Sequence, residues 1–345
     1  MRAVLHHGPR DIRVETVPDP VLLEPTDAIV RVTLSCICGS DLWPYRRQDA
    51  PEHAHRIGHE FLGVVEEVGA DVRTLAVGDL VIAPFMYSCG DCEFCRAGLQ
   101  TSCVRGGFYG SESIGGGQGQ VVRVPLADGT LVAAPVGEDD PRLPALLTLS
   151  DVMATGHHAA VSAGVGAGSH VVVIGDGAVG LCGVLAAHRL GAERITLLST
   201  HEDRAAIGRR FGATEVIAER GEAAVAAVLE RTDGLGAPHV MECVGMQGSW
   251  DTAVRIARPG GTIGYVGVPN GVDEGLDLSV LFRRNVTVRG GVAPARAYLP
   301  ELLADVLDGT IDPSPVFDLE LSLEEAPEGY AAMDQRRATK VLLRP

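Results

Sequence analysis

The chain has 345 residues and a formal net charge of −16. This length exceeds what one ordinary hydrophobic core holds, so two domains are expected. Binding to a phosphate backbone needs clustered Lys and Arg, and the negative charge therefore argues against nucleic acid or an anionic membrane as a partner. Lys340 is the only lysine, which excludes a Walker-type P-loop and argues against Schiff-base catalysis.

The N-terminal segment, residues 1–20, lacks the uninterrupted apolar core of a signal peptide. The longest nearly apolar run, residues 171–187, contains Asp176 and several glycines. It therefore predicts a buried strand followed by a helix rather than a membrane span. We expect a cytoplasmic protein, in which clustered cysteines are more often metal ligands than disulfides.

The first half of the chain, to about residue 150, predicts an all-β, barrel-like domain. Short apolar runs are separated by Gly, Pro and Asp, which is typical of strands joined by tight turns. These runs are residues 27–34, 63–69, 79–84 and 120–125.

Four cysteines lie close together within this half, at Cys89, Cys92, Cys95 and Cys103. They are separated by two, two and seven residues, so one tight loop can present all four sulfurs to the same ion. Four thiolates complete a tetrahedral zinc, and the predicted site is therefore structural rather than catalytic. Free or redox-active cysteines are the alternative, although a redox pair needs only two sulfurs.

After residue 170, apolar strand patterns alternate with helical ones, which predicts a parallel, doubly wound sheet. Gly191 is the expected cap of the first helix. The strands and helices expected in chain order are residues 170–175 (strand), 178–190 (helix), 194–199 (strand), 201–212 (helix), 239–245 (strand) and 260–268 (strand).

The segment "GDGAVG", residues 175–180, places Gly175, Gly177 and Gly180 in the G-x-G-x-x-G spacing. It follows a predicted strand and opens a predicted helix, which is the context of a dinucleotide-binding fingerprint. The glycines let the backbone approach a pyrophosphate, whose charge is met by the helix N-terminus. A purely structural glycine turn is the alternative.

Three further motifs are "CICGSD" at 36–41, "GHEF" at 58–61 and "SDVMATG" at 150–156. Taken singly, a His is commonly a core or surface residue, a Cys a small hydrophobe, and an Asp before a helix an N-cap. In this order, and with the cysteine cluster and the glycine motif, the sequence resembles the zinc-dependent alcohol dehydrogenases of the medium-chain dehydrogenase/reductase superfamily. The resemblance covers essentially the whole chain.

The resemblance implies an α/β protein in which a GroES-like catalytic domain, residues 1–152 and 289–345, accompanies a Rossmann coenzyme domain, residues 153–288. It implies an oxidoreductase that transfers a hydride between a nicotinamide cofactor and a small alcohol or carbonyl compound. Its bacterial members suggest a homodimer or a homotetramer.

The resemblance also implies a catalytic zinc held by Cys38, His59 and Asp151, with Glu60 beside it as an outer or exchangeable ligand. Together with the cysteine cluster this makes two zinc ions per chain. Many members of the family have a second Cys in place of Asp151, and an Asp followed by "VMATG" resembles the bacterial secondary-alcohol branch. Three protein ligands leave a fourth position open, where zinc can lower the pKa of an alcohol or polarise a carbonyl.

The end of the second Rossmann strand bears on cofactor choice. NAD-specific members have an Asp there that binds the ribose hydroxyls. Here Ser199 ends the strand, followed by Thr200, His201 and Arg204, an edge that accommodates a 2′-phosphate. Glu202 and Asp203 oppose this, yet NADP(H) is the predicted cofactor. The expected cofactor-binding residues are Gly175, Gly177, Ala178, Val179, Gly180, Ser199, Thr200, His201, Arg204, Val244 and Val266.

The expected substrate pocket is lined by Trp43, Phe85 and Tyr109, which equally well fit the description of core aromatics. Ser40 is expected to act in catalysis, because it lies two residues from Cys38. Many relatives carry a proton-relay His where Trp43 stands, and an indole cannot shuttle protons near neutral pH. Three alternatives follow for the route of the substrate proton. It leaves through ordered water beside Ser40, another His such as His53 or His55 takes over, or the substrate needs no relay.

Two other functional classes stay open. A reductase of the same fold acting on an enone, imine or quinone is one, although quinone reductases of the superfamily generally lack both zinc sites. A non-enzymatic nucleotide-binding sensor is the other, and it would not need an open zinc position. The remaining cysteines are expected to be small buried residues; they are Cys36, Cys182 and Cys243.

Overall fold

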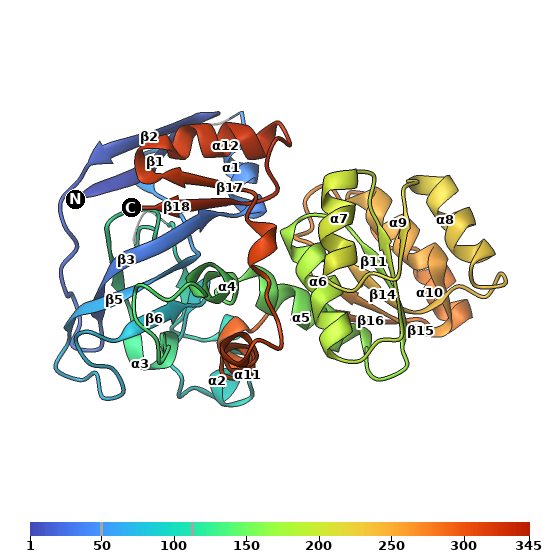
Figure 1. Ribbon diagram of the computed structural model, residues 1–345, viewed down its shortest axis with the longest axis horizontal. Helices are drawn as coiled ribbons and strands as arrows, with labels where there is room; N and C mark the ends of the chain where they lie inside the picture. The colour runs from blue at the N-terminus through green and yellow to red at the C-terminus, as the bar shows by residue number, and fades with distance from the viewer. Residues whose placement is uncertain (49–50, 112–113) are drawn as a thin grey trace. The chain divides into compact units, whose positions relative to one another are not determined.

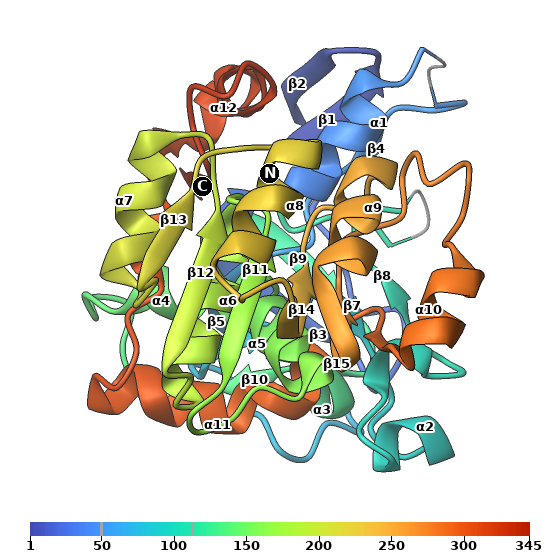
Figure 2. The ribbon, with the colours of Figure 1, turned by 90° about the vertical axis from the view of Figure 1, so that its right-hand side faces the viewer.

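A computed structural model describes residues 1–48, 51–111 and 114–345 of the chain. The chain divides into two compact units (Figures 1 and 2). The first unit comprises Met1–Asp151 and Pro294–Pro345, and the second comprises Val152–Ala293. The junctions expected from the sequence lie after residues 152 and 288, close to these two divisions.

The first unit is rich in strands, as the first half of the sequence predicts, but it is not all-β, because it also contains α-helices. Most of its strands pair antiparallel, whereas β17 and β18 are parallel. Its largest sheet has the order β10-β6-β5-β3-β18-β17, and β9 pairs with β3 off this path. A second sheet has the order β2-β1-β4, and β7 pairs with β8. The strands are β1 (Arg2–Gly8), β2 (Asp11–Thr16), β3 (Ala28–Ile37), β4 (His55–Arg56), β5 (Phe61–Val68), β6 (Leu80–Ala83), β7 (Met86–Tyr87), β8 (Gly107–Phe108), β9 (Val121–Val124), β10 (Val132–Ala133), β17 (Leu319–Ser322) and β18 (Val341–Arg344).

The four strands predicted in the first half are confirmed as β3, β5, β6 and β9. Strand β3 is central and buries nearly every side chain, because other strands pair with both of its edges. Gly63 of β5 is required by this packing, since a Cβ atom there would lie 2.0 Å from the carbonyl oxygen of Arg31. The last strand, β18, pairs antiparallel with β3 and so brings the end of the chain beside Ile37.

Helices complete the first unit, most of them short and the longest, α11, 14 residues long. Apolar side chains of β3, β5, β6 and β9 form one of its cores. A second core joins β1, α1, α12 and β18. The α-helices are α1 (Leu42–Arg46), α2 (Glu93–Arg96), α3 (Ala127–Thr130), α4 (Leu143–Thr148), α11 (Ala295–Asp308) and α12 (Ala326–Asp334). The 3₁₀-helices are η1 (Gly39–Asp41), η2 (Gln100–Ser102), η3 (Ser314–Val316) and η4 (Leu323–Glu325).

The second unit contains a six-stranded sheet in the order β13-β12-β11-β14-β15-β16, in which every pair is parallel. The predicted doubly wound sheet is therefore confirmed. Its strands are β11 (His170–Ile174), β12 (Arg194–Leu198), β13 (Glu215–Ile217), β14 (Ala237–Glu242), β15 (Ala257–Tyr265) and β16 (Thr287–Gly290). Its helices are α5 (Val152–Ala163), α6 (Ala178–Arg189), α7 (Glu202–Arg210), α8 (Gly221–Glu230), α9 (Gln247–Ile256) and α10 (Leu278–Arg284).

Helices cover both faces of this sheet (Figure 2). One face packs against α8 and α9 through a core that includes Val172, Val240 and Trp250. On the other face, Leu197 touches α7 at Gly208, and Gly264 lies against α5. Alternate residues of each strand are therefore buried on opposite faces, as expected of a doubly wound fold.

The predicted cap of the first Rossmann helix is also confirmed. Gly191 has φ of +86°, and its N–H donates to the carbonyl of His188 at the end of α6. The predicted strand 239–245 differs from the structure, in which β14 ends at Glu242. The chain turns directly afterwards, because the carboxylate of Glu242 accepts hydrogen bonds from the N–H groups of Val244 and Gly245.

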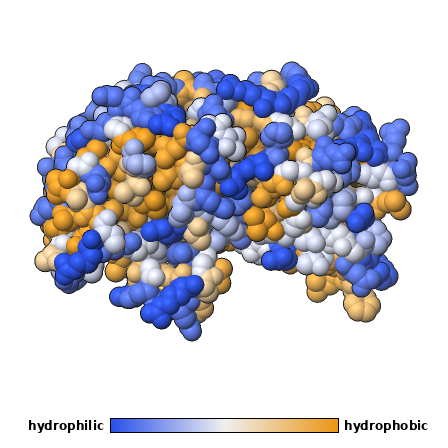
Figure 3. Space-filling view, turned by 60° about the horizontal axis from the view of Figure 1, so that its bottom comes forward, coloured by the Kyte–Doolittle hydropathy of each residue, from blue (hydrophilic) through white to orange (hydrophobic). Residues whose placement is uncertain are grey.

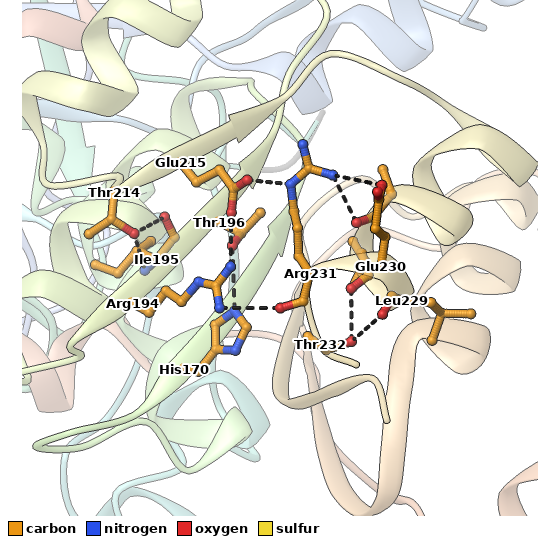
Figure 4. A network of polar contacts seen from close by, with 12 residues as sticks. His170, Arg194, Ile195, Thr196, Thr214, Glu215, Leu229, Glu230, Arg231 and Thr232 are labelled. Atoms are coloured by element: carbon orange, nitrogen blue, oxygen red, sulfur yellow. Dashed lines mark hydrogen bonds and ion pairs between the residues drawn. The ribbon is translucent and has the colours of Figure 1, made fainter. Parts of the chain in front are cut away.

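A polar network ties together the amino-terminal ends of the strands in this sheet (Figure 4). Thr196 and His170 approach to 3.5 Å, while Glu215 pairs with both Arg194 and Arg231. The network joins β11, β12, β13 and the residue that follows α8. The opposite, carboxyl edge of the sheet is where ligands bind in folds of this class.

The surface on the face drawn in Figure 3 alternates between polar areas and apolar patches. Across the residues that the structure describes, no helix combines the length and the apolar character required to cross a membrane.

Candidate zinc and cofactor sites

Four potential metal ligands of the first unit converge: Cys38, His59, Glu60 and Asp151. Cys38 follows β3 and precedes η1, His59 and Glu60 come directly before β5, and Asp151 precedes α5. One ligand atom from each lies within 4.8 Å of the others. The structure thus brings together all the residues that the resemblance assigns to the catalytic zinc, although they are up to 113 positions apart.

The donor set fits a divalent cation. The Sγ atom of Cys38 lies 3.6 Å from Oδ2 of Asp151, and Nε2 of His59 lies 3.4 Å from the same oxygen. Burial raises the pKa of the Cys38 thiol, and the carboxylates of Glu60 and Asp151 raise it further. A bound zinc would offset this buried negative charge, and it takes thiolate, imidazole and carboxylate ligands.

Asp41 orients the imidazole of His59, a role that the sequence alone did not assign. Its carboxylate lies 3.3 Å from Nδ1 of His59, so the opposite nitrogen, Nε2, faces Asp151. Asp41 is itself held by the N–H of Cys38 at 3.0 Å and the amide of Gln118 at 3.3 Å. A carboxylate behind a metal-binding His fixes its tautomer and ring orientation. The one sequence signal that could have pointed to this role is that Asp41 belongs to the same motif as Cys38, residues 36–41.

Lys340 is the second residue at this site that sequence reasoning missed. Its Nζ donates to Oε1 of Glu60 at 2.6 Å, and both side chains are almost fully buried. Glu60 has one further oxygen, Oε2, that is buried without a hydrogen-bond partner. The two residues are 280 positions apart, so only the fold could reveal the pair.

A pocket of the first unit adjoins the Asp41–His59 pair, and we call it the histidine pocket. Its lining includes Asp41, His59, His6 and His55. His6 is buried, and its Nε2 has no hydrogen-bond partner. The pocket is therefore polar enough to hold ordered water. Ser40 lies in η1 and is half-buried, and His53 is exposed.

The three expected pocket aromatics occupy different surroundings. Phe85 is buried, with its ring 6.4 Å from that of His59 and 6.0 Å from that of Phe108. Tyr109 packs within a core of the first unit, although it also lines the histidine pocket. Trp43 is half-buried on α1. Phe108, which is 51% exposed, is an aromatic neighbour of Phe85 that sequence reasoning missed.

The cysteine cluster forms a second group around α2 and η2. Its sulfur atoms are 3.4 Å apart for Cys103 and Cys89, 3.9 Å for Cys89 and Cys95, and 4.0 Å for Cys92 and Cys103. A tetrahedral zinc with Zn–S bonds of about 2.3 Å places its sulfurs roughly 3.8 Å apart. All four are free cysteines, so the cluster fits a structural zinc. Backbone hydrogen bonds from Cys95 and Val104 lower the pKa of Cys92 to about 6, whereas burial raises the pKa of Cys95 to about 12.

The glycine loop of the second unit fits a close approach by a ligand. Gly175 has φ of +113°, a conformation that glycine adopts without strain. A Cβ atom at Gly180 would lie 1.9 Å from the carbonyl oxygen of Gly175, so helix and strand pack without side chains between them. At Gly177 a Cβ atom would meet nothing within 4 Å, and α6 begins at the next residue. The N–H groups of Ala178 and Val179 thus stand at the N-terminus of a twelve-residue helix.

The other expected cofactor residues lie at the same edge of the sheet. Ser199 follows β12, Val244 follows β14 and Val266 follows β15. The parallel pairing of β11 with β12 and β14, and of β14 with β15, places these strand ends beside the glycine loop. This is the carboxyl edge of the sheet, where dinucleotides bind in Rossmann folds.

The residues after β12 that are expected to choose between NAD(H) and NADP(H) are Ser199, Thr200, His201 and Arg204, and we call them the specificity edge. Asp176, the variable residue between the first two glycines, contacts three of them. Its carboxylate accepts a hydrogen bond from Ser199 at 2.8 Å, lies 2.8 Å from Nδ1 of His201, and pairs with Arg204 at 3.4 Å. Burial acts to raise the pKa of Asp176, but His201, Ser199 and Arg204 outweigh it and lower that pKa. A second cation also reaches this edge, because Arg220 donates to Thr200 at 2.6 Å. Neither Asp176 nor Arg220 was assigned from the sequence.

Comparisons with known proteins agree with this geometry. Residues 24–135 match the alcohol dehydrogenase GroES-like domain, and residues 178–308 match the zinc-binding dehydrogenase domain. A probable zinc-binding alcohol dehydrogenase of Mycobacterium tuberculosis is 35% identical, over 100% of this chain and 89% of the relative. A formaldehyde dismutase of Pseudomonas putida is 32% identical, over 100% and 97%.

Among solved structures, an alcohol dehydrogenase from Thermus sp. ATN1 superposes with a TM-score of 0.91 and 34% identity, covering 100% of this chain and 99% of its own. The expected architecture of a GroES-like domain with a Rossmann domain is confirmed. The chain is therefore an oxidoreductase that belongs to the zinc-dependent alcohol dehydrogenase family of the medium-chain dehydrogenase/reductase superfamily.

Proposed function

We propose that this protein is a two-zinc, NADP(H)-preferring dehydrogenase that acts on a small alcohol or carbonyl compound, either a secondary alcohol and its ketone or an aldehyde. The observation that carries the proposal is the convergence of Cys38, His59 and Asp151. Three such ligands suit a catalytic rather than a structural zinc, because they leave one position open.

When bound, zinc supplies Lewis acidity toward an alcohol or carbonyl oxygen, and the nicotinamide gives or accepts the hydride. The residues of the chain would bind the metal ion, balance its charge and orient its ligands and the substrate. Cys38 and Asp151 would contribute two negative charges to balance the ion, and Asp41 holds His59 with Nε2 turned toward Asp151. Phe85 and Phe108 would offer an apolar surface to the substrate carbon atoms.

Ser40 is the residue that we propose to handle the substrate proton. It lies two residues from Cys38, and its hydroxyl can both accept and donate a hydrogen bond. In this proposal, the proton passes from Ser40 to ordered water, with the histidine pocket offering space and the imidazoles of His55 and His6 beyond it. This route takes the place of the relay His that is absent at Trp43.

The preference for NADP(H) rests on the charges at the specificity edge. His201, Arg204 and Arg220 are grouped there with the hydroxyls of Ser199 and Thr200. Arg and hydroxyl groups are the usual partners of a phosphate. Asp176 is an opposing charge, but it is already engaged by His201, Ser199 and Arg204. The edge thus keeps cationic and hydrogen-bonding groups that suit a 2′-phosphate.

A homodimer or homotetramer is part of the proposal. Strand β16 is the last strand of the parallel sheet, and α10 beside it leaves Phe282 84% exposed. An edge strand next to an exposed apolar side chain favours association with a second copy. Light scattering at several concentrations tests this expectation.

The proposed function is tested by metal analysis together with a substrate panel. We expect two zinc ions per chain and turnover of alcohols, aldehydes or ketones with a higher kcat/KM for NADP(H) than for NAD(H). Formaldehyde belongs in the panel, because the relatives include proteins named as formaldehyde dismutase and formaldehyde dehydrogenase. One zinc per chain and no hydride transfer would instead favour a nucleotide-binding sensor, and turnover of imines or enones alone would favour the reductase alternative.

A further inference from the structure

Glu242 ends β14 at the carboxyl edge of the parallel sheet, and it is fully buried. Its Oε1 accepts hydrogen bonds from the N–H groups of Val244 at 2.9 Å and Gly245 at 2.8 Å. A backbone N–H that is removed from water needs an acceptor. The course of the chain directly after β14 therefore depends on this one side chain.

The same residue also holds the segment that follows the neighbouring strand, β15. Its backbone carbonyl accepts hydrogen bonds from the N–H groups of Val266 at 2.9 Å and Gly267 at 3.2 Å. We call residues 243–246 and 266–270 the paired loops. The side chain of Glu242 thus fixes one of the paired loops, and its backbone fixes the other.

The paired loops pack without side chains between them. A Cβ atom at Gly267 would lie 2.2 Å from the backbone nitrogen of Gly245. Gly245 has φ of +82°, and a Cβ atom there would lie 2.0 Å from the carbonyl oxygen of Val268. The carbonyl of Gly245 also accepts the N–H of Asn270 at 3.1 Å. A change in one loop is therefore transmitted to the other.

The strand order indicates which half of a dinucleotide meets the paired loops. Strand β11, which leads into the glycine loop, pairs with β12 on one side and with β14 on the other. A pyrophosphate at the glycine loop and a 2′-phosphate at the specificity edge place the adenosine half toward β12. The nicotinamide half then lies on the opposite side, at the paired loops. Val244 and Val268 offer apolar surface there, since they are 38% and 51% exposed.

We propose that Glu242 is a positioning residue that orders the paired loops for the nicotinamide half of the cofactor; this inference rests on the proposed function. Loops that are ordered in advance lower the entropic cost of binding. The adenosine half meets the glycine loop and the specificity edge instead. Glu242 therefore acts on one half of the cofactor and leaves the affinity for the other half unchanged.

The experiment compares a cofactor with its fragment by calorimetry on the zinc-loaded, full-length protein, and it needs no turnover. The pairs are NADPH with 2′-phospho-ADP-ribose, and NADH with ADP-ribose; each fragment keeps the adenosine half and the pyrophosphate but lacks the nicotinamide. The pair used is that of the cofactor which the wild type binds more tightly.

Three substitutions of Glu242 separate its possible roles. Glu242→Ala removes the acceptor, Glu242→Asp keeps a carboxyl group but shortens its reach, and Glu242→Gln keeps an acceptor at the original reach. Glu215→Ala is the matched control. It loses ion pairs to Arg194 and Arg231 at the opposite edge of the same sheet, and so reports on general destabilisation of this unit.

Glu242→Ala should weaken binding of the intact cofactor by about tenfold or more, because ordering the backbone of even one residue during binding costs about that factor. Its affinity for the fragment should stay at the wild-type value. Glu242→Asp should show the same selective loss, while Glu242→Gln and Glu215→Ala should bind both ligands as the wild type does. If Glu242→Ala fails to fold, Glu242→Asp and Glu242→Gln provide the same comparison.

Equal losses of cofactor and fragment in Glu242→Ala or Glu242→Asp would overturn the inference, since they would mean that Glu242 supports the fold alone. Wild-type cofactor binding in Glu242→Asp together with a loss in Glu242→Gln would also overturn it, because charge rather than reach would then be decisive. A wild type that binds neither NADPH nor NADH would refute the proposed function itself.

Discussion

The carboxylate of Asp176 lies 2.8 Å from Nδ1 of His201, at the carboxyl edge of the parallel sheet. Asp176 belongs to the glycine loop and His201 follows the neighbouring strand, so the contact joins the two parts of a dinucleotide site. The same carboxylate pairs with Arg204. The cations proposed to receive a 2′-phosphate are therefore preorganised by an acidic residue of the loop.

Arg204→Gln should lower kcat/KM for NADPH by about 10–100-fold, which corresponds to the loss of a hydrogen bond to a charged group. The value for NADH should change little, because that cofactor has no 2′-phosphate. Arg209→Gln is the matched control, since Arg209 lies on the same helix and pairs with the exposed Glu202. Steady-state kinetics with both cofactors provide the measurement. An equal loss with NADH would show that Arg204 acts on the fold of the loop.

Ser199→Asp should shift the preference toward NAD(H). The new carboxylate would repel a 2′-phosphate and could accept hydrogen bonds from ribose hydroxyls. It would also lie next to Asp176, whose carboxylate now accepts from Ser199. We therefore expect the ratio of kcat/KM values to reverse while overall affinity for both cofactors falls. If the variant still favoured NADPH, Ser199 would not be a residue that determines the choice of cofactor.

The cysteine cluster gives a prediction for metal content. Cys95→Ser should lose about one zinc per chain and lower the melting temperature, because structural zinc contributes directly to folding. Cys182→Ser is the control, since Cys182 is a buried cysteine of α6 in the other unit. Metal analysis of gel-filtered protein decides between the outcomes. Two zinc ions retained in Cys95→Ser would exclude the cluster as a metal site.

Local patterns were sufficient to predict several elements of the fold and its two-part division, while the GroES-like and Rossmann architecture followed from the family resemblance. Apolar runs bounded by Gly and Pro gave β3, β5, β6 and β9, and the cysteine spacing indicated a cluster whose sulfurs do approach to 3.4–4.0 Å. The glycine motif was recognisable because it connects a strand pattern to a helix pattern. Each of these signals lies within a few neighbouring residues, where sequence and structure correspond most directly.

Residues that act through distant contacts could not be assigned in this way. Lys340 meets Glu60 across 280 positions, and a lone lysine near the end of a chain resembles any surface residue. Asp41 and Asp176 fall inside recognised motifs, yet their roles depend on which imidazole the fold places opposite them. Phe108 was overlooked because its partner, Phe85, is separated from it by the cysteine cluster.

Glu242 provides a prediction on pH and stability. Burial raises the pKa of this carboxyl, although hydrogen bonds from Gly245 and Val244 act against the shift. A group with a raised pKa in the folded state favours folding when protonated. Its contribution is full below the unfolded pKa of about 4.3 and is lost as the pH rises through the higher folded value.

Glu242→Gln keeps the amide acceptor for the turn and removes the titration. The melting temperature of the variant minus that of the wild type, both measured without cofactor, should therefore increase as the pH rises from 4 toward 7. Glu230→Gln, at a side chain that is 84% exposed, should show no such trend. A difference that widened toward acid pH instead would mean that the charged form of Glu242 is the stabilising one.

Ser40 and the histidine pocket carry the last prediction, which concerns the substrate proton. Ser40→Ala should lower kcat for the best alcohol by about 10²–10⁴-fold, the usual contribution of a positioned proton-transfer group. Zinc content should stay at two per chain, because Ser40 is not among the four converging ligands.

His55→Gln separates the two routes for the proton. If ordered water alone carries it away, this variant should retain nearly wild-type kcat; if His55 replaces the relay His, kcat should fall below neutral pH and be rescued by added imidazole buffer. His53→Gln is the control, since His53 is an exposed histidine two residues away. An unchanged kcat in Ser40→Ala would exclude both routes and would favour a substrate, such as an imine, whose reaction does not begin with the loss of a hydroxyl proton.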